Sequence, residues 1–93
     1  MVSHGPESRP PASPRERVLR EQTAIDALDK EIISLVEQRQ RHCRAVRRQR
    51  ETEPRSRTDL ARENAVVAAY HAHLGETGTT MALALLQACR HCT

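Results

Sequence analysis

Two arginines occupy positions where the pattern of a predicted helix calls for apolar residues. Ahead of them, aliphatic side chains recur at alternating steps of three and four residues, which places them on one helix face. The next steps of that rhythm reach Arg39 and, beyond Val46, Arg50, about three helical turns later. A guanidinium binds carboxylates and phosphates through paired hydrogen bonds, so these arginines predict a bound anion, or a face that ends in solvent. We call the four aliphatic residues the apolar stripe: Ile25, Leu28, Ile32 and Leu35.

The composition predicts a small helical protein that pairs with another chain. A chain of 93 residues supplies one thinly buried core, which favours oligomerisation. Phe and Trp are absent and Tyr occurs once, so the core must come from aliphatic side chains, which suit interdigitated helices. The net charge of +3 comes almost wholly from arginine, because Lys30 is the only lysine. This bias suits recognition of carboxylates or phosphates, and GC-rich coding explains it equally well.

The three cysteines are expected to be free thiols. Their odd number, with neither a signal peptide nor a long apolar run in the sequence, predicts a reduced, soluble, cytoplasmic protein. We expect Cys43 on the flank of the first helix, Cys89 in the core and Cys92 as a terminal thiol. The run "CRHC" lacks the second ligand pair of a structural zinc site, so no metal site is predicted.

The first helix has a well-marked start. Residues 1–12 are rich in Pro, Ser and Gly and predict a disordered tail, so the folded domain is expected over residues 13–93. Ser13 is suited to the N-cap, Pro14 to the first helical position and Glu16 to a capping box. A helix from Pro14 to about Glu51 would be roughly 55 Å long, too long for a compact domain of this size, so it must pack along other helices.

Two further helices complete an all-α protomer with one long, one medium and one short helix. After a polar loop at residues 52–57, a second helix is expected to end at Gly75 as a C-cap. "ETGTT" predicts a turn in which Thr79 or Thr80 caps a short third helix, and no strand pattern occurs. The predicted buried side of the second helix consists of Leu60, Val66, Val67, Tyr70 and Leu74.

Two segments of the chain resemble the all-helical chorismate mutases, and more closely their short actinobacterial branch. They are "IDALDKEIISLVEQR" and "LARENAVVAAYHAHLGETGTTMALALLQACR". The likeness runs from about Arg20 to Arg90 and rests on the ID-x-L-D run, the stripe arginine and the "RE" pair. The resemblance implies an intertwined homodimer in which each active site borrows a residue from the other subunit. It also implies the Claisen rearrangement of chorismate to prephenate, without a cofactor or a covalent intermediate.

The chemistry that the resemblance implies needs cations at fixed positions. Holding both carboxylates of the dianionic substrate selects its reactive conformer, and a cation at the ether oxygen stabilises the charge that grows there. By resemblance, Arg39 clamps a carboxylate, and Arg50 meets the ether oxygen and a carboxylate. Arg62 is expected near a carboxylate and Glu63 at the ring hydroxyl. Asp59 matches a position that binds the same region in some members, and it is equally explained as a first-turn acid that complements the helix dipole.

Two features depart from the family pattern. Gln22 stands where the family carries an arginine that reaches into the partner's active site. A neutral amide cannot make the bidentate contact of a guanidinium. The chain also ends about where longer members supply a glutamine at the ether oxygen, and Gln87 lies too early to take that role. The departures suggest that the isolated protein is only weakly active on chorismate. Full activity would then depend on a complex with the synthase that opens the shikimate pathway. They also suit a chorismate relative such as 4-amino-4-deoxychorismate or isochorismate.

Other classes of protein remain as alternatives. One is a regulatory, non-catalytic subunit with the mutase fold, in primary aromatic amino-acid synthesis or in a specialised pathway. Another is a basic helical dimer that binds nucleic acid through its phosphates. The sequence argues against this class, because acidic residues interrupt the basic stretch on both sides. The arginines off the stripe, Arg41, Arg44, Arg47 and Arg48, fit a solvated basic face.

Overall fold

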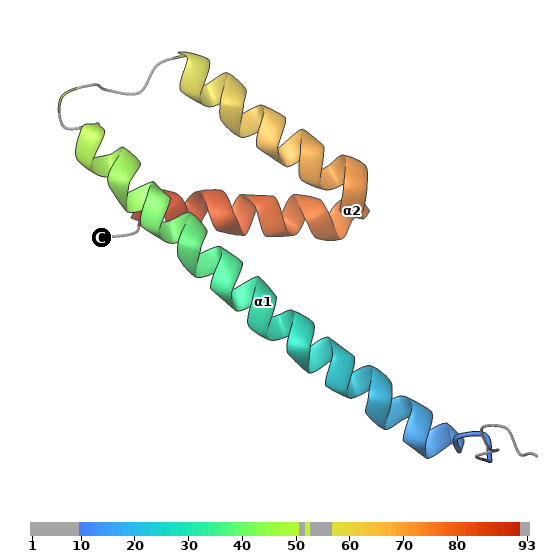
Figure 1. Cartoon of the computed structure of the whole chain (residues 1–93). Coiled ribbons are helices and arrows are strands. Elements are labelled where there is room, and N and C mark those ends of the chain that lie inside the picture. Colours follow the sequence, from blue (N-terminus) through green and yellow to red (C-terminus); the bar gives the residue numbers. More distant parts are fainter. Residues whose placement is uncertain (1–9, 51, 53–56, 92–93) are drawn as a thin grey trace, which may run out of the picture. The chain divides into compact units, whose positions relative to one another are not determined.

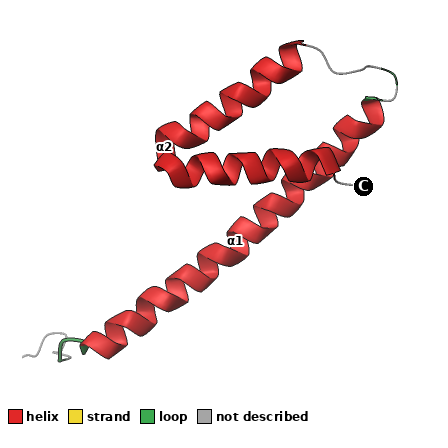
Figure 2. Ribbon diagram, turned by 180° about the vertical axis from the view of Figure 1, so that it is seen from behind, coloured by secondary structure: helices red, strands yellow, loops and turns green. Residues whose placement is uncertain are grey.

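The computed structural model describes residues 10–50, 52 and 57–91. They form two helices, α1 (Pro14–Gln49) and α2 (Arg57–His91), and these described residues contain no strand (Figures 1 and 2). The predicted all-α class is therefore confirmed. The internal contacts of the chain divide it into two units, residues 1–33 and 34–93. None of the described helices combines the length and the apolar character needed to cross a membrane.

The start of α1 is the predicted capping box. The backbone N–H of Ser13 donates to Oε1 of Glu16 at 2.9 Å, and the N–H of Glu16 donates to Oγ of Ser13 at 3.1 Å. The hydrogen bonds from Ser13 lower the pKa of Glu16, because they favour its ionised form. At the other end α1 stops at Gln49, close to the predicted limit at Glu51, which lies outside the described residues.

The apolar stripe of α1 is open on the single chain. Its four residues are between 48% and 61% exposed, although aliphatic side chains at this spacing normally face a core. Three of them, Ile25, Leu28 and Ile32, belong to the unit of residues 1–33, whose described residues 10–33 contain no helix besides α1. Within those described residues this part of α1 packs against no second helix.

In the unit of residues 34–93, α2 bends sharply at Gly75. That residue has φ 66° and ψ −144°, a backbone conformation that suits glycine because it has no Cβ. We call residues 57–74 the first arm of α2 and residues 76–91 its second arm (Figure 1). They cover the residues of the predicted medium and short helices, which the structure joins into one bent helix, so three separate helices are not found among the described residues. The predicted turn over residues 76–80 is wrong, because these residues are helical, so neither Thr79 nor Thr80 caps a new helix.

The sharp bend brings the two arms into backbone contact at Gly78. A Cβ on this buried residue would lie 2.1 Å from the carbonyl oxygen of Tyr70, so only glycine allows the approach. Beside it, Nδ1 of His71 and Oγ1 of Thr79 lie 3.0 Å apart in a hydrogen bond between the arms. The predicted buried side of the first arm is only partly correct. Its central residues Val66, Val67 and Tyr70 are half-buried, whereas Leu60 and Leu74 are exposed.

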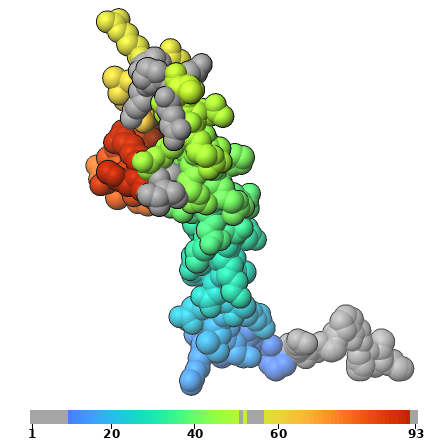
Figure 3. Space-filling model, turned by 90° about the vertical axis from the view of Figure 1, so that its left-hand side faces the viewer, coloured from blue at the N-terminus to red at the C-terminus, as the bar shows by residue number. Residues whose placement is uncertain are grey.

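A disulfide joins the second arm to α1. Cys43 and Cys89, 46 residues apart in sequence, are bonded to each other, and Cys43 is among the most buried residues. Figure 3 shows the second arm (red) lying against the later half of α1 (green). The expectation of free thiols is therefore wrong for Cys43 and Cys89, and Cys92 lies outside the described residues. Cysteine count and spacing gave no sign of the bond, because the fold alone brings these two helices together.

Candidate functional site

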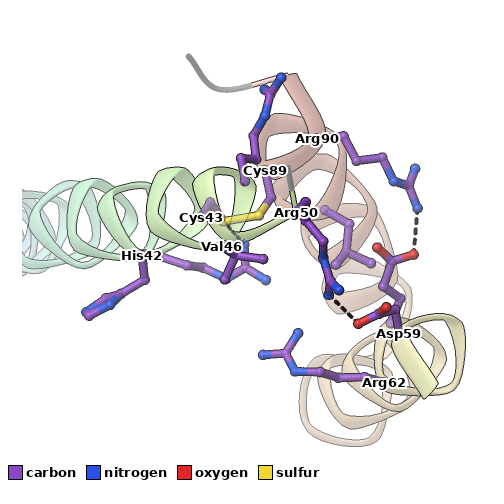
Figure 4. Close-up of a pocket in the computed structure, with 12 residues that line it drawn as sticks. His42, Cys43, Val46, Arg50, Asp59, Arg62, Cys89 and Arg90 are labelled. Atoms are coloured by element: carbon purple, nitrogen blue, oxygen red, sulfur yellow. Dashed lines mark hydrogen bonds and ion pairs between the residues drawn. A yellow bond between two sulfur atoms is a disulfide. The ribbon is translucent and has the colours of Figure 1, made fainter. Parts of the chain in front are cut away.

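Five of the six predicted site residues line one pocket in the unit of residues 34–93. The pocket has a volume of about 710 Å³ and is bounded by the later part of α1 and both arms of α2 (Figure 4). Val46 and Leu86 supply apolar surface, and the disulfide between Cys43 and Cys89 forms part of the wall. The predicted residues that line it are Arg39, Arg50, Asp59, Arg62 and Glu63.

Arg39 is held between α1 and the second arm. Its Nη1 donates to the backbone oxygen of Leu85 at 3.3 Å and lies 3.9 Å from Sγ of Cys43. The residue is half-buried, as its place on the line of the apolar stripe predicts. A guanidinium has five N–H donors, so these contacts leave donors for an anion in the pocket.

Arg50 and Asp59 form an ion pair that joins the end of α1 to the first turn of α2. Figure 4 shows their side chains pointing toward one another. The side chains are 33% and 20% exposed, so the pair is partly shielded from solvent. Asp59 thus contacts a predicted catalytic cation, besides standing where it complements the helix dipole.

Arg62 and Glu63 follow one another on the first arm, and their side chains have different surroundings. Oε1 of Glu63 accepts a hydrogen bond from Nη2 of Arg90 at 2.8 Å, and the Glu63 side chain is only 17% exposed. Arg62 is exposed, and within the described part of the chain no hydrogen bond or ion pair to it is found. Arg62 therefore offers its full fork of donors to a ligand.

The pocket carries an excess of positive charge. Among the described residues that line it are five arginines and two carboxylates, a net of three positive charges. Every one of these cations is an arginine, and the chain's single lysine, Lys30, is not among the lining residues. A concave site with this balance concentrates anions and disfavours cationic ligands.

Gln22 is the predicted site residue that does not line this pocket. It lies on α1 in the unit of residues 1–33 and is exposed. Gln87, on the second arm, is also exposed and does not line the pocket. The structure therefore brings five of the predicted residues together within one chain, and Gln22 is not one of them.

The sequence prediction missed several lining residues. Of the four arginines predicted to form a solvated basic face, Arg41, Arg47 and Arg48 are exposed, although Arg47 also lines the pocket, and the prediction is wrong for Arg44, which is half-buried. Arg90 was not singled out at all, and its partner Glu63 is 27 residues away. No local pattern could have revealed that contact, because it forms only once α2 has bent at Gly75.

The geometry can be set beside known proteins. A family model described as chorismate mutase type II matches residues 20–86. Comparisons with curated proteins and with solved structures gave no match. The matched span contains all six predicted site residues and ends before Cys89 and Arg90.

Proposed function

Because this chain belongs to the type II chorismate mutase family, we propose that its pocket rearranges chorismate to prephenate with the residues of the described site. The observation that carries the proposal is the convergence of Arg39, Arg50 and Arg62 on one pocket of about 710 Å³. Three guanidiniums from α1 and α2 suit a small substrate with two carboxylates.

The proposed source of catalysis is orientation of the substrate. Arg39 and Arg62 each hold one carboxylate, which selects the conformer that brings the enolpyruvyl carbon over the ring. Arg39 is suited to this role because its contacts with Leu85 and Cys43 fix its position before substrate arrives. Prior positioning lowers the barrier by several kcal/mol, since the entropy of alignment is already lost on binding.

Electrostatic stabilisation is the second proposed contribution. Negative charge grows on the ether oxygen as the C–O bond breaks, and Arg50 is the cation we assign to it. The ion pair with Asp59 directs Arg50, so we assign Asp59 a supporting role. Glu63 accepts a hydrogen bond from the ring hydroxyl of the substrate.

We also propose that the working form is a homodimer with intertwined first helices. The open apolar stripe on α1 supports this, because four aliphatic side chains that are roughly half exposed lose their contact with water when a second copy covers them. In this dimer Gln22 approaches the pocket of the partner subunit, at the position where the family carries an arginine. The domain that we propose to dimerise spans residues 13–93, and most of the tail predicted over residues 1–12 lies outside the described residues.

Gln22 also favours a second candidate function. A site with an amide in place of one arginine suits a chorismate relative, such as 4-amino-4-deoxychorismate or isochorismate. It also suits a weakly active subunit completed by a partner such as the first enzyme of the shikimate pathway.

We assign the protein to the cytoplasm. In that reducing compartment the Cys43–Cys89 bond is expected to open, and thiol labelling in cells tests this directly.

The test is the loss of chorismate's ultraviolet absorbance with purified protein. Arg39→Ala is expected to abolish turnover, and Arg41→Ala, an exposed arginine of α1 outside the pocket, is the matched control that should retain it. A folded wild-type dimer that leaves chorismate unchanged would contradict the proposal. The same assay with 4-amino-4-deoxychorismate then tests the second candidate.

A further inference from the structure

We propose that Arg90 is a positioning residue for Glu63 and that the C-terminal turn of α2 is part of the mutase site, held against α1 by buried Leu86 and the Arg39–Leu85 hydrogen bond whether the Cys43–Cys89 bond is closed or reduced. The inference rests on the proposed role of Glu63 at the ring hydroxyl. It concerns residues 89 and 90, which lie beyond the span that the family model matches.

The contact between the two side chains is direct and bridges the two arms of α2. Nη2 of Arg90 lies 2.8 Å from Oε1 of Glu63, the distance of a charge-assisted hydrogen bond (Figure 4). The Glu63 side chain is 17% exposed and that of Arg90 is 50% exposed. Arg90 therefore reaches inward from the rim of the pocket to a more buried carboxylate.

The backbone that carries Arg90 is attached to α1 at adjacent points. Cys89, its neighbour in sequence, is bonded to Cys43, and Arg39 donates to the carbonyl of Leu85 one turn earlier. Leu86, between these two points, is buried. The last turn of α2 is thus fixed against the end of α1, which supplies Arg39 and leads into Arg50.

The geometry suits an action through Glu63 better than direct binding of substrate. A guanidinium that holds one carboxylate oxygen restricts the rotamers of that side chain, and an ionised carboxylate has enough acceptor sites to receive a further donor from substrate. Arg90 can thereby hold Glu63 in place for the ring hydroxyl. Misplacement of such a group by about 1 Å can lower the rate as much as a hundredfold, so the support matters even though Arg90 does not touch the reacting atoms.

The test is a double-mutant cycle on the full chain, with kcat and KM for chorismate as the readout. Arg90→Met is expected to lower kcat about tenfold with KM within about twofold, because Glu63 is left misplaced. Arg90→Lys should restore most of the loss, because an ammonium still reaches the carboxylate. In a Glu63→Ala background, Arg90→Met should change kcat by less than about twofold. Arg48→Met, an exposed arginine of α1 outside the pocket, is the control for loss of charge.

The outcomes separate this proposal from the proposed function. An equal loss of kcat in both backgrounds, or a rise in KM alone, would show that Arg90 acts elsewhere or binds substrate itself, and would overturn the proposal. A Glu63→Ala variant with wild-type kcat would also overturn the Arg90 proposal. The mutase function would still stand in that case, provided that Arg39→Ala is inactive. If wild-type protein binds chorismate without converting it, the mutase function fails. In that case the dissociation constant of chorismate is measured for the same set of variants, and it decides whether Arg90 acts through Glu63. If chorismate does not bind at all, both the mutase function and the Arg90 proposal are overturned.

Discussion

Arg50, just past the end of α1, is ion-paired with Asp59 in the first turn of α2. The pair ties together the two helices that line the pocket, at the point where the chain passes from one to the other. It also explains why a cation lies on the line of the apolar stripe: the guanidinium of Arg50 meets a carboxylate instead of a hydrophobic core.

Loss of the Asp59 carboxylate should lower activity more than stability. Asp59→Asn removes the charge that directs Arg50, so we expect kcat for chorismate to fall about tenfold. The free energy of unfolding should change by less than about 1 kcal/mol, because the pair is partly exposed. Chorismate absorbance and urea unfolding measure the two effects. If kcat is unchanged, the role of Asp59 is limited to a favourable interaction with the helix dipole.

An arginine at position 22 should strengthen substrate binding. Gln22→Arg restores a charge-assisted contact worth about 1.5 to 3 kcal/mol, so kcat/KM for chorismate should rise about 10- to 100-fold. Gln38→Arg, another exposed glutamine of α1, is the control for added charge. If both variants match the wild type, the missing arginine does not limit turnover.

Removal of the disulfide should destabilise the protein. The bond closes a loop of 46 residues, and chain entropy gives it a contribution of about 4 kcal/mol to the free energy of unfolding. Cys43→Ser should show this loss in urea unfolding of oxidised protein, and a reducing agent should bring the wild type to the same value. Cys92→Ser is the control and should leave both the bond and the stability unchanged; a loss there would contradict the pairing of Cys43 with Cys89.

The two glycines of α2 should respond differently to a methyl group. At Gly78 an added Cβ would lie 2.1 Å from the backbone oxygen of Tyr70, so Gly78→Ala should force the arms apart and cost about 3 kcal/mol or more. At Gly75 the space is open, and Gly75→Ala meets only the penalty of a backbone at φ 66° and ψ −144°, about 1 to 3 kcal/mol. Thermal unfolding ranks the two variants, and the reverse order would contradict the close packing of the arms.

The capping box should make the start of α1 sensitive to acid. The lowered pKa of Glu16 means that its contribution to stability is present above its ordinary pKa of 4.5 and is lost as the pH falls through the lower value in the folded state. Glu16→Gln keeps the cap but cannot titrate. As the pH falls through the lowered pKa of Glu16, the wild type should therefore lose helicity relative to the variant. Circular dichroism between neutral pH and pH of about 3 tests this, and parallel curves would argue against the cap.

Local features of the sequence predicted the ends of elements better than their packing. Ser13 and Glu16 lie three residues apart, so the cap they form could be found without knowledge of the fold. Gly75 is predicted to end a helix from its residue type alone, and in the structure it is the point at which α2 bends and then continues to His91. The helical course of residues 76–80 could not be found, because it depends on the close approach of Gly78 to Tyr70 across the bend.

The helical stripe alone pointed to Arg39 and Arg50, and the likeness to a known family added Asp59, Arg62, Glu63 and Gln22. All of these except Gln22 line the pocket. The pairs Cys43–Cys89 and Arg90–Glu63 join residues 46 and 27 positions apart, so no spacing rule relates them. They follow from the path of α2 after its bend, which tertiary contacts determine.

The exclusive use of arginine in the described pocket has a practical consequence. Amine-directed reagents modify lysine and leave a protonated guanidinium untouched at neutral pH. Since the single lysine, Lys30, does not line the pocket, amine coupling modifies one side chain outside the pocket, besides the α-amino group of the chain. The pocket arginines stay unmodified in such a conjugate, so ligand binding can be followed on immobilised protein.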